Sequence, residues 1–105
     1  MSEIVLVYTL FGDRDAAEAV ARAMVERRLA ACANLLGDGT SIYPWEGRID
    51  RAGEVPVLFK TVPARRDALM AAIGAMHNYD LPAILSWPAV TTPAYAAWVA
   101  GETDS

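Results

Sequence analysis

The feature that most constrains the fold of this chain is a tight turn at Trp45-Glu46-Gly47-Arg48, between two long β-prone segments. Glu46-Gly47 suits a two-residue hairpin turn, in which Gly supplies a positive φ. The arms of this hairpin run from about 33 to 45 and from 48 to 61. At ~3.3 Å per residue, each arm could extend about 40 Å. We therefore expect a long β-hairpin at the centre of the fold.

Each arm contains one break in its strand pattern. Gly37-Asp38-Gly39 in the first arm predicts a turn or a bulge. Pro56 in the second arm lacks the backbone N–H that a ladder uses, so part of that strand should lie at an edge or a bulge.

The segments on either side of the hairpin each predict one strand and one helix. Before it, a β-branched run at 4–9 leads into a helix at about 13–28, with Asp13 as N-cap. After it, a helix begins near Pro63 and ends near His77. A short strand at 83–87 follows, and Pro88 is expected to stop it.

This order of elements predicts an α+β fold of the ferredoxin-like βαββαβ type, an antiparallel sheet with a long central β-hairpin and both main helices on one face. Thr92-Pro93 then predicts an extra C-terminal helix, because Thr is a good N-cap and Pro suits the first helical position. Tyr95, Trp98 and Val99 share one face of that helix, and a polar tail is expected from Gly101.

The size and composition of the chain indicate one domain over residues 1–105, since 105 residues are too few for two domains. A net charge of −4 argues against a nucleic-acid partner. The single cysteine, Cys32, excludes an intrachain disulfide and suits a reducing compartment. The N-terminus lacks the pattern of a signal peptide, and no run of ~18 apolar residues predicts a membrane span. We expect a cytoplasmic protein.

The length of the hairpin predicts self-association. A domain of about 100 residues has a radius of gyration of only about 13 Å, so two helices cannot cover arms of this length. Apolar side chains in the far arms would then lie on exposed strand edges, which are aggregation-prone unless they are paired. The expected interface residues are Ile42, Tyr43, Trp45 and Ile49.

Four blocks of the sequence, at 26–34, 41–49, 59–61 and 77–82, resemble the CutA (CutA1) divalent-cation-tolerance family in order and spacing. Ala-Ala-Cys-Ala-Asn at 30–34 and Tyr-x-Trp-Glu-Gly at 43–47 are the most specific pieces. The resemblance implies a ferredoxin-like homotrimer in which the hairpins pair between subunits. It also implies a role in tolerance of copper or other divalent metals, and a subunit plan similar to that of PII signalling proteins, which bind small molecules between subunits.

The chain departs from the family pattern where some relatives have metal ligands. Tyr8 stands in place of a cysteine at the end of the first strand, and Met76 and Asn78 change the residues on either side of His77. Ala83 replaces the acidic residue that usually follows Pro82. Each change removes a candidate ligand or alters its surroundings.

Cys32 and His77 are the remaining candidate ligands for copper or another divalent metal, because thiolate and imidazole both suit copper and zinc. Each has an alternative explanation. Free cysteines are usually small buried hydrophobes, and a histidine near a helix C-terminus often caps the helix or interacts with its dipole.

A second candidate site combines Lys60, Glu54, Tyr79 and Trp45, which could bind an anionic or polar small molecule in a cleft between subunits. The alternative is an interface salt bridge with aromatic packing. Trp45, Trp87 and Trp98 are in any case expected to be packing or interface anchors. The chain contains no common enzyme motif, and Arg14 follows Gly12-Asp13 without a Gly-rich phosphate cradle, so we expect a non-enzymatic protein.

Overall fold

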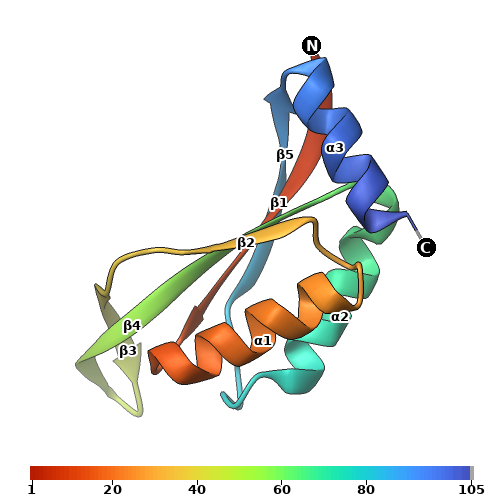
Figure 1. Ribbon diagram of the computed structural model, residues 1–105. Helices are drawn as coiled ribbons and strands as arrows, with labels where there is room; N and C mark the ends of the chain where they lie inside the picture. The colour runs from red at the N-terminus through yellow and green to blue at the C-terminus, as the bar shows by residue number, and fades with distance from the viewer. Residues whose placement is uncertain (105) are drawn as a thin grey trace.

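Five strands and three α-helices form the chain in a computed structural model that describes residues 1–104 (Figure 1). They occur in the order expected from the sequence. The strands are β1 (Ser2–Phe11), β2 (Cys32–Leu35), β3 (Gly39–Trp45), β4 (Arg48–Thr61) and β5 (Ile84–Thr91). The helices are α1 (Arg14–Glu26), α2 (Arg66–Met76), which a short 3₁₀ turn at Pro63–Arg65 precedes, and α3 (Pro93–Thr103).

The sheet is antiparallel throughout and has the order β2-β4-β1-β5, with β3 paired to the outer half of β4. Side chains alternate between the two faces of a strand. Val5, Val7 and Phe11 of β1 pack in one core with α1 and α2, whereas Ile4 and Leu6 pack in a second cluster with α3. Both main helices therefore cover one face, which confirms the ferredoxin-like prediction, and α3 covers one end of the other face.

The main core lies between the sheet and the two long helices. Its fully buried side chains come from the middle of the sheet and from α2, and include Val7, Val57, Phe59, Leu69 and Ile73. Helix α1 adds its buried stripe of Ala17, Val20, Ala21 and Met24. The Asp13 carboxylate accepts a hydrogen bond from the Ala16 backbone N–H at 2.8 Å, which confirms the N-cap.

The hairpin turns at the predicted position and with the predicted geometry. Trp45 pairs with Arg48, and the two residues between them, Glu46 and Gly47, have φ of 50° and 82°. Positive φ at both central positions matches the right-handed twist of the strands. The hairpin stretches the molecule along its longest dimension of 46 Å (Figure 1).

The break in the first arm is a β-bulge opposite Pro56. Leu35 pairs with Val57 and Gly39 with Glu54, so three residues, 36–38, lie opposite two, 55–56. The Leu36 N–H donates to the Pro56 carbonyl at 2.9 Å, so the side of Pro56 that lacks a donor faces the bulge. Both predicted irregularities are thus one feature.

Arg14 fastens this bulge to the start of α1. Its guanidinium donates to the Leu36 carbonyl and to the Asp38 carboxylate, both at 2.9 Å. Arg14 therefore has structural partners in the hairpin, a backbone carbonyl and a carboxylate.

Two expectations at the C-terminal end are wrong. Pro88 does not stop β5, which continues to Thr91; β5 is an edge strand with a neighbour on one side only, where a missing N–H is tolerated. The chain from Gly101 is not a polar tail either, because α3 continues to Thr103. The Thr103 side chain is buried and donates to the Val99 carbonyl at 2.8 Å, while Arg65 donates to the Thr103 carbonyl at 2.9 Å.

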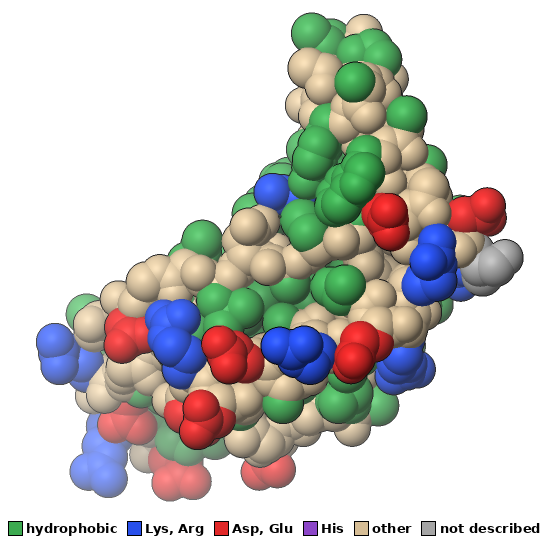
Figure 2. Space-filling view, viewed as in Figure 1, with side chains coloured by type: hydrophobic (Ala, Val, Ile, Leu, Met, Phe, Trp, Pro, Cys, Tyr) green, Lys and Arg blue, Asp and Glu red, His purple; other side chains and the backbone are tan. Residues whose placement is uncertain are grey.

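The face of the sheet opposite α1 and α2 leaves large apolar side chains in the open. Leu85 and Trp87 of β5, the cross-strand partners of Tyr8 and Leu6, are 53% and 42% exposed. Ile42 and Ile49 at the far end of the hairpin are both 70% exposed, but by alternation along β4 they lie on the other face, the face of Val55 and Val57. In Figure 2, charged side chains gather over α1, whereas the start of α3 and the neighbouring strand ends are mostly apolar. No helix among residues 1–104 is long and apolar enough to cross a membrane.

Candidate functional site

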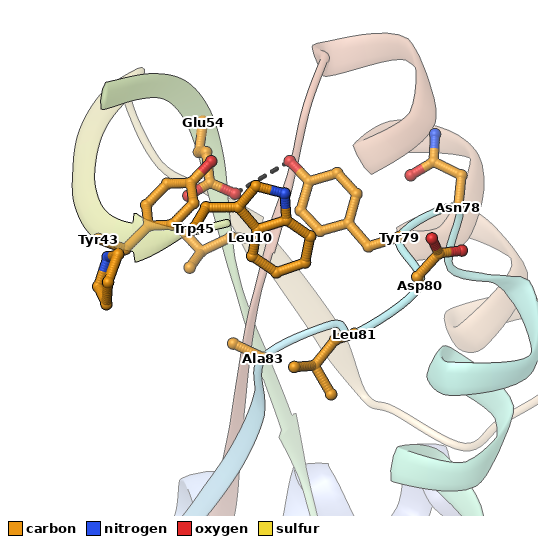
Figure 3. A pocket seen from close by; sticks show the side chains of 10 residues that line it. Leu10, Tyr43, Trp45, Glu54, Asn78, Tyr79, Asp80, Leu81 and Ala83 are labelled. Atoms are coloured by element: carbon orange, nitrogen blue, oxygen red, sulfur yellow. Dashed lines mark hydrogen bonds between the residues drawn. The ribbon is translucent and has the colours of Figure 1, made fainter. Parts of the chain in front are cut away.

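A cavity of about 570 Å³ lies between the hairpin and the loop after α2 (Figure 3). Tyr43 and Trp45 reach it from β3, and Glu54 from the facing arm, β4. The loop contributes three polar side chains in succession. The lining consists of three aromatic residues, two acids, one amide and four apolar residues: Tyr43, Trp45, Tyr79, Glu54, Asp80, Asn78, Leu10, Pro44, Leu81 and Ala83.

A hydrogen bond between Tyr79 and Glu54 joins the two sides of the cavity. The Tyr79 hydroxyl donates to Glu54 Oε2 at 2.9 Å (Figure 3). Burial, followed by this hydrogen bond and the charge of Glu54, raises the pKa of Tyr79 to about 12. Tyr79 therefore keeps its proton at neutral pH and acts as a donor that orients the carboxylate.

His77 holds the loop in place with both ring nitrogens. Nδ1 accepts the Tyr79 backbone N–H at 3.1 Å, and Nε2 lies 2.8 Å from the Leu10 carbonyl oxygen. A carbonyl only accepts, so the proton of the neutral ring is on Nε2. The ring also stacks on Phe11 with centroids 4.4 Å apart. In this chain His77 acts as an anchor, and a metal could bind it only if one of these hydrogen bonds were broken.

Gly12 makes room for the Tyr79 ring. A Cβ atom at this position would lie 3.2 Å from the Tyr79 hydroxyl oxygen, closer than ordinary van der Waals contact. A larger residue would push Tyr79 away from Glu54. Sequence reasoning considered Gly12 only as part of Gly12-Asp13-Arg14, which lacks a Gly-rich phosphate cradle.

Cys32 belongs to a different group of side chains, at the opposite end of the sheet. Its Sγ lies 3.6 Å from the Tyr95 hydroxyl, and the Lys60 Nζ lies 5.8 Å from the centre of the Tyr95 ring. Cys32 is the cross-strand partner of Lys60. Burial and the contact with Cys32 raise the pKa of Tyr95 to about 12.

The structure brings together three of the four residues of one predicted site and separates the two residues of the other. Trp45, Glu54 and Tyr79 line one cavity, but Lys60 is six residues from Glu54 along β4, which corresponds to about 20 Å. Cys32 and His77 are also apart within one chain. Cys32 pairs with Lys60, which pairs with Leu6, whereas His77 contacts Leu10, four residues or about 13 Å further along β1.

Residues 1–104 contain no cluster of three or more His, Cys, Asp and Glu side chains placed to hold a metal ion. A metal site built from one chain alone is therefore not present in the described residues. The cavity residues that sequence reasoning did not propose as ligand contacts are Leu10, Tyr43, Pro44, Asn78, Asp80, Leu81 and Ala83. All but Leu10 lie within four residues of Trp45 or Tyr79 in the sequence, and this was the one available signal.

Comparison with known proteins places the chain in a family. The family model described as CutA1 divalent ion tolerance protein matches residues 5–102. The chain belongs to the CutA1 family. The divalent-cation tolerance protein CutA of Thermococcus kodakarensis is 39% identical over 82 residues, which are 78% of each protein.

Two further CutA proteins show how much of the chain the sequence and structural similarity covers. The mouse protein CutA is 39% identical over 90 residues, 85% of this chain but only 51% of the mouse protein, so the chain spans about half the length of that relative. The crystal structure of CutA from Xylella fastidiosa superposes with a TM-score of 0.94 at 33% identity, covering 98% of this chain and 100% of the other. The CutA1 fold therefore extends over almost the whole chain.

Three of the four residues named above as departures from the expected family pattern lie at the cavity or on its face of the sheet. Asn78 and Ala83 line it directly. Tyr8 lies on the same face of β1 as Leu10 and packs beside Trp87, with ring centroids 6.5 Å apart.

Proposed function

We propose that this CutA1-family protein is a non-enzymatic, cytoplasmic homotrimer that binds divalent metal ions such as copper as part of metal tolerance. The match to the divalent ion tolerance family over residues 5–102 carries the metal part of the proposal. The free thiol of Cys32 supports a reducing compartment and offers a ligand that suits copper.

Exposed apolar side chains support the homotrimer. Leu85 and Trp87 lie on the sheet face opposite α1 and α2, Ile42 and Ile49 lie on the other face at the far end of the hairpin, and all four are more than one third exposed in the single chain. A soluble monomer rarely leaves so many large apolar side chains uncovered, and copies of the same chain would bury them. Assembly would also bring ligands from neighbouring subunits toward one another, which a mononuclear metal site needs because Cys32 and His77 lie apart within one chain.

Metal titration tests the proposal. The chelator-stripped protein, with Cys32 reduced beforehand and the reductant then removed, is titrated with Cu²⁺ and with Zn²⁺ in a calorimeter under anaerobic conditions, and we expect saturable binding tighter than millimolar. Cys32→Ser should weaken copper binding by about tenfold or more, because it removes the thiol and keeps a similar shape. A Cys32→Ser protein that binds as the parent does would exclude the thiol as a ligand, and a blank titration of the parent would remove the metal function.

A second candidate function is a PII-like sensor that binds a small molecule in clefts between subunits. The observation that favours it is the cavity around Glu54 and Tyr79, whose volume of about 570 Å³ lies within the usual range for small-molecule sites. The cavity opens on the sheet face that we propose to be the trimer interface. Lys60 is far from Glu54 in the same chain and could join the site only from a neighbouring subunit.

A further inference from the structure

The charges that one chain contributes to the cavity favour a cation over an anion. Glu54 and Asp80 both line it, and the described lining contains no Lys or Arg side chain. Tyr79 adds no positive charge, because its phenol is neutral. An anion entering this space would meet two carboxylates with no cation to offset them, whereas a cation would be attracted.

The Glu54 carboxylate is oriented and still has an unused acceptor. Tyr79 donates to Oε2, and within residues 1–104 no hydrogen bond is found to Oε1. A carboxylate oxygen of this kind can accept an N–H donor, and hydrogen bonds between charged groups are stronger than neutral ones. Tyr79 thus fixes the orientation of the Glu54 carboxylate through Oε2, and Oε1 is available to accept a hydrogen bond from a ligand in the cavity.

Aromatic rings form the walls beside this carboxylate. Figure 3 shows the rings of Tyr43, Trp45 and Tyr79 grouped next to Glu54, with Asp80 on the loop side. The face of an indole or phenol ring attracts a cation within about 6 Å of its centre, most strongly for Trp. Leu10 and Leu81 supply apolar surface in the same cavity.

A bare or hydrated metal ion fits these walls less well than an organic cation. Hard divalent ions require six or more oxygen ligands, and no cluster of three or more metal-ligating side chains occurs in the described residues. An organic ammonium ion needs fewer polar contacts. Its N–H groups can reach one or two carboxylates, and its carbon skeleton can cover aromatic and aliphatic side chains.

We propose that this cavity is a binding site for a small organic ammonium ion, with the ammonium group against Glu54 and the ring face of Trp45, and the apolar part against Leu10 and Leu81. The proposal rests on the second candidate function, which it sharpens by naming the chemical class of the ligand. It does not depend on metal binding at Cys32.

Isothermal titration with three ligands of similar shape tests the charge preference. The purified full chain is titrated with 2-phenylethylamine, 2-phenylethanol and 3-phenylpropionate at low ionic strength. Both ligands carry the same phenyl ring, but only the amine can form an ion pair with Glu54 and a cation–π contact with Trp45. The amine should therefore bind at least about tenfold more tightly than the alcohol. The anion should not bind detectably.

Matched variants assign the binding to the cavity. Glu54→Gln retains an acceptor for Tyr79 but removes the charge, and it should weaken binding of the amine about tenfold or more. Glu102→Gln removes an acid from the exposed side of α3 and should leave the affinity unchanged. Trp45→Leu should also weaken binding of the amine. Because Trp45 is also an expected interface residue, this variant is compared only if light scattering gives it the same mass as the parent protein.

The outcomes separate this proposal from the function on which it rests. Equal affinity for amine and alcohol, or an unchanged affinity in Glu54→Gln, would overturn the ammonium site. Tight binding of 3-phenylpropionate alone would overturn it and leave a small-molecule sensor standing. If none of the three ligands binds at millimolar concentration, the cavity is not a site for this class of ligand.

Discussion

At the scale of single residues, two buried threonines on the core face of the sheet differ in one hydrogen bond. Thr61 Oγ1 donates to the Leu29 carbonyl at 2.8 Å, whereas Thr9 Oγ1 is buried with no partner among residues 1–104. An unsatisfied buried hydroxyl costs about 1–3 kcal/mol, and Val has the same shape without the polar atom. We predict that Thr9→Val raises the free energy of unfolding by about 1 kcal/mol, measured by urea denaturation at a constant protein concentration.

Thr61→Val is the matched control for this prediction. It removes a hydroxyl that has a partner and leaves the Leu29 carbonyl unpaired, so it should lower the free energy of unfolding by about 1 kcal/mol. Shifts of the same sign in both variants would contradict the explanation.

At the scale of elements, the hairpin carries a local strain at its turn. Glu46 has a φ of 50°, a left-handed conformation that costs an ordinary L-residue about 1–2 kcal/mol and that Asn tolerates. Asn-Gly is also the preferred pair in this type of turn. We predict that Glu46→Asn stabilises the protein by about 0.5–1 kcal/mol, measured as a higher midpoint of thermal unfolding.

Glu46→Gln separates backbone conformation from charge in that experiment. Gln loses the same charge as Asn but has no special tolerance of a positive φ, so its unfolding midpoint should stay close to that of the parent. Equal stabilisation by Asn and Gln would show that the charge of Glu46, and not its conformation, is the cause.

At the scale of the whole molecule, the exposed apolar hairpin predicts assembly. We expect light scattering to report three times the 11.3-kDa mass of the chain. Ile42 and Ile49 face the same side of the hairpin and are 70% exposed, so replacing both with Lys should leave each chain folded but reduce the mass of the assembly, because like charges would be placed where subunits pack.

Val25→Lys is the control for assembly. Val25 is also partly exposed but lies on α1 and not on the hairpin. The mass should therefore stay at the parent value. A parent protein that remains monomeric at high concentration would rule out the homotrimer.

Predictions from sequence succeeded where the cause is local. Asp13 caps α1 because its carboxylate reaches an N–H three residues away, and the chain turns at Gly47 because glycine accepts a positive φ without strain. The prediction that Pro88 ends the last strand was wrong, because a proline is tolerated in an edge strand and the order of strands in the sheet decides which strand is at an edge. The prediction of a polar tail from Gly101 was wrong, because α3 continues to Thr103. Burial of Thr103 and hydrogen bonds from Arg28 and Arg65, which are distant in the sequence, stabilise this last turn.

The sequence by itself determined the order of elements, the position and type of the hairpin turn, and the resemblance to the CutA1 family. These follow from residue preferences over a few positions and from short motifs. Only the tertiary structure decided which side chains share a site. Tyr79 meets Glu54 across 25 residues and His77 meets Leu10 across 67, because strand order and the path of the loop set those distances, whereas Lys60 remains remote from Glu54 because β4 is extended. The hairpin is therefore both the element most visible in the sequence and one wall of a cavity for which the sequence indicated Trp45, Glu54 and Tyr79 but not the other lining residues.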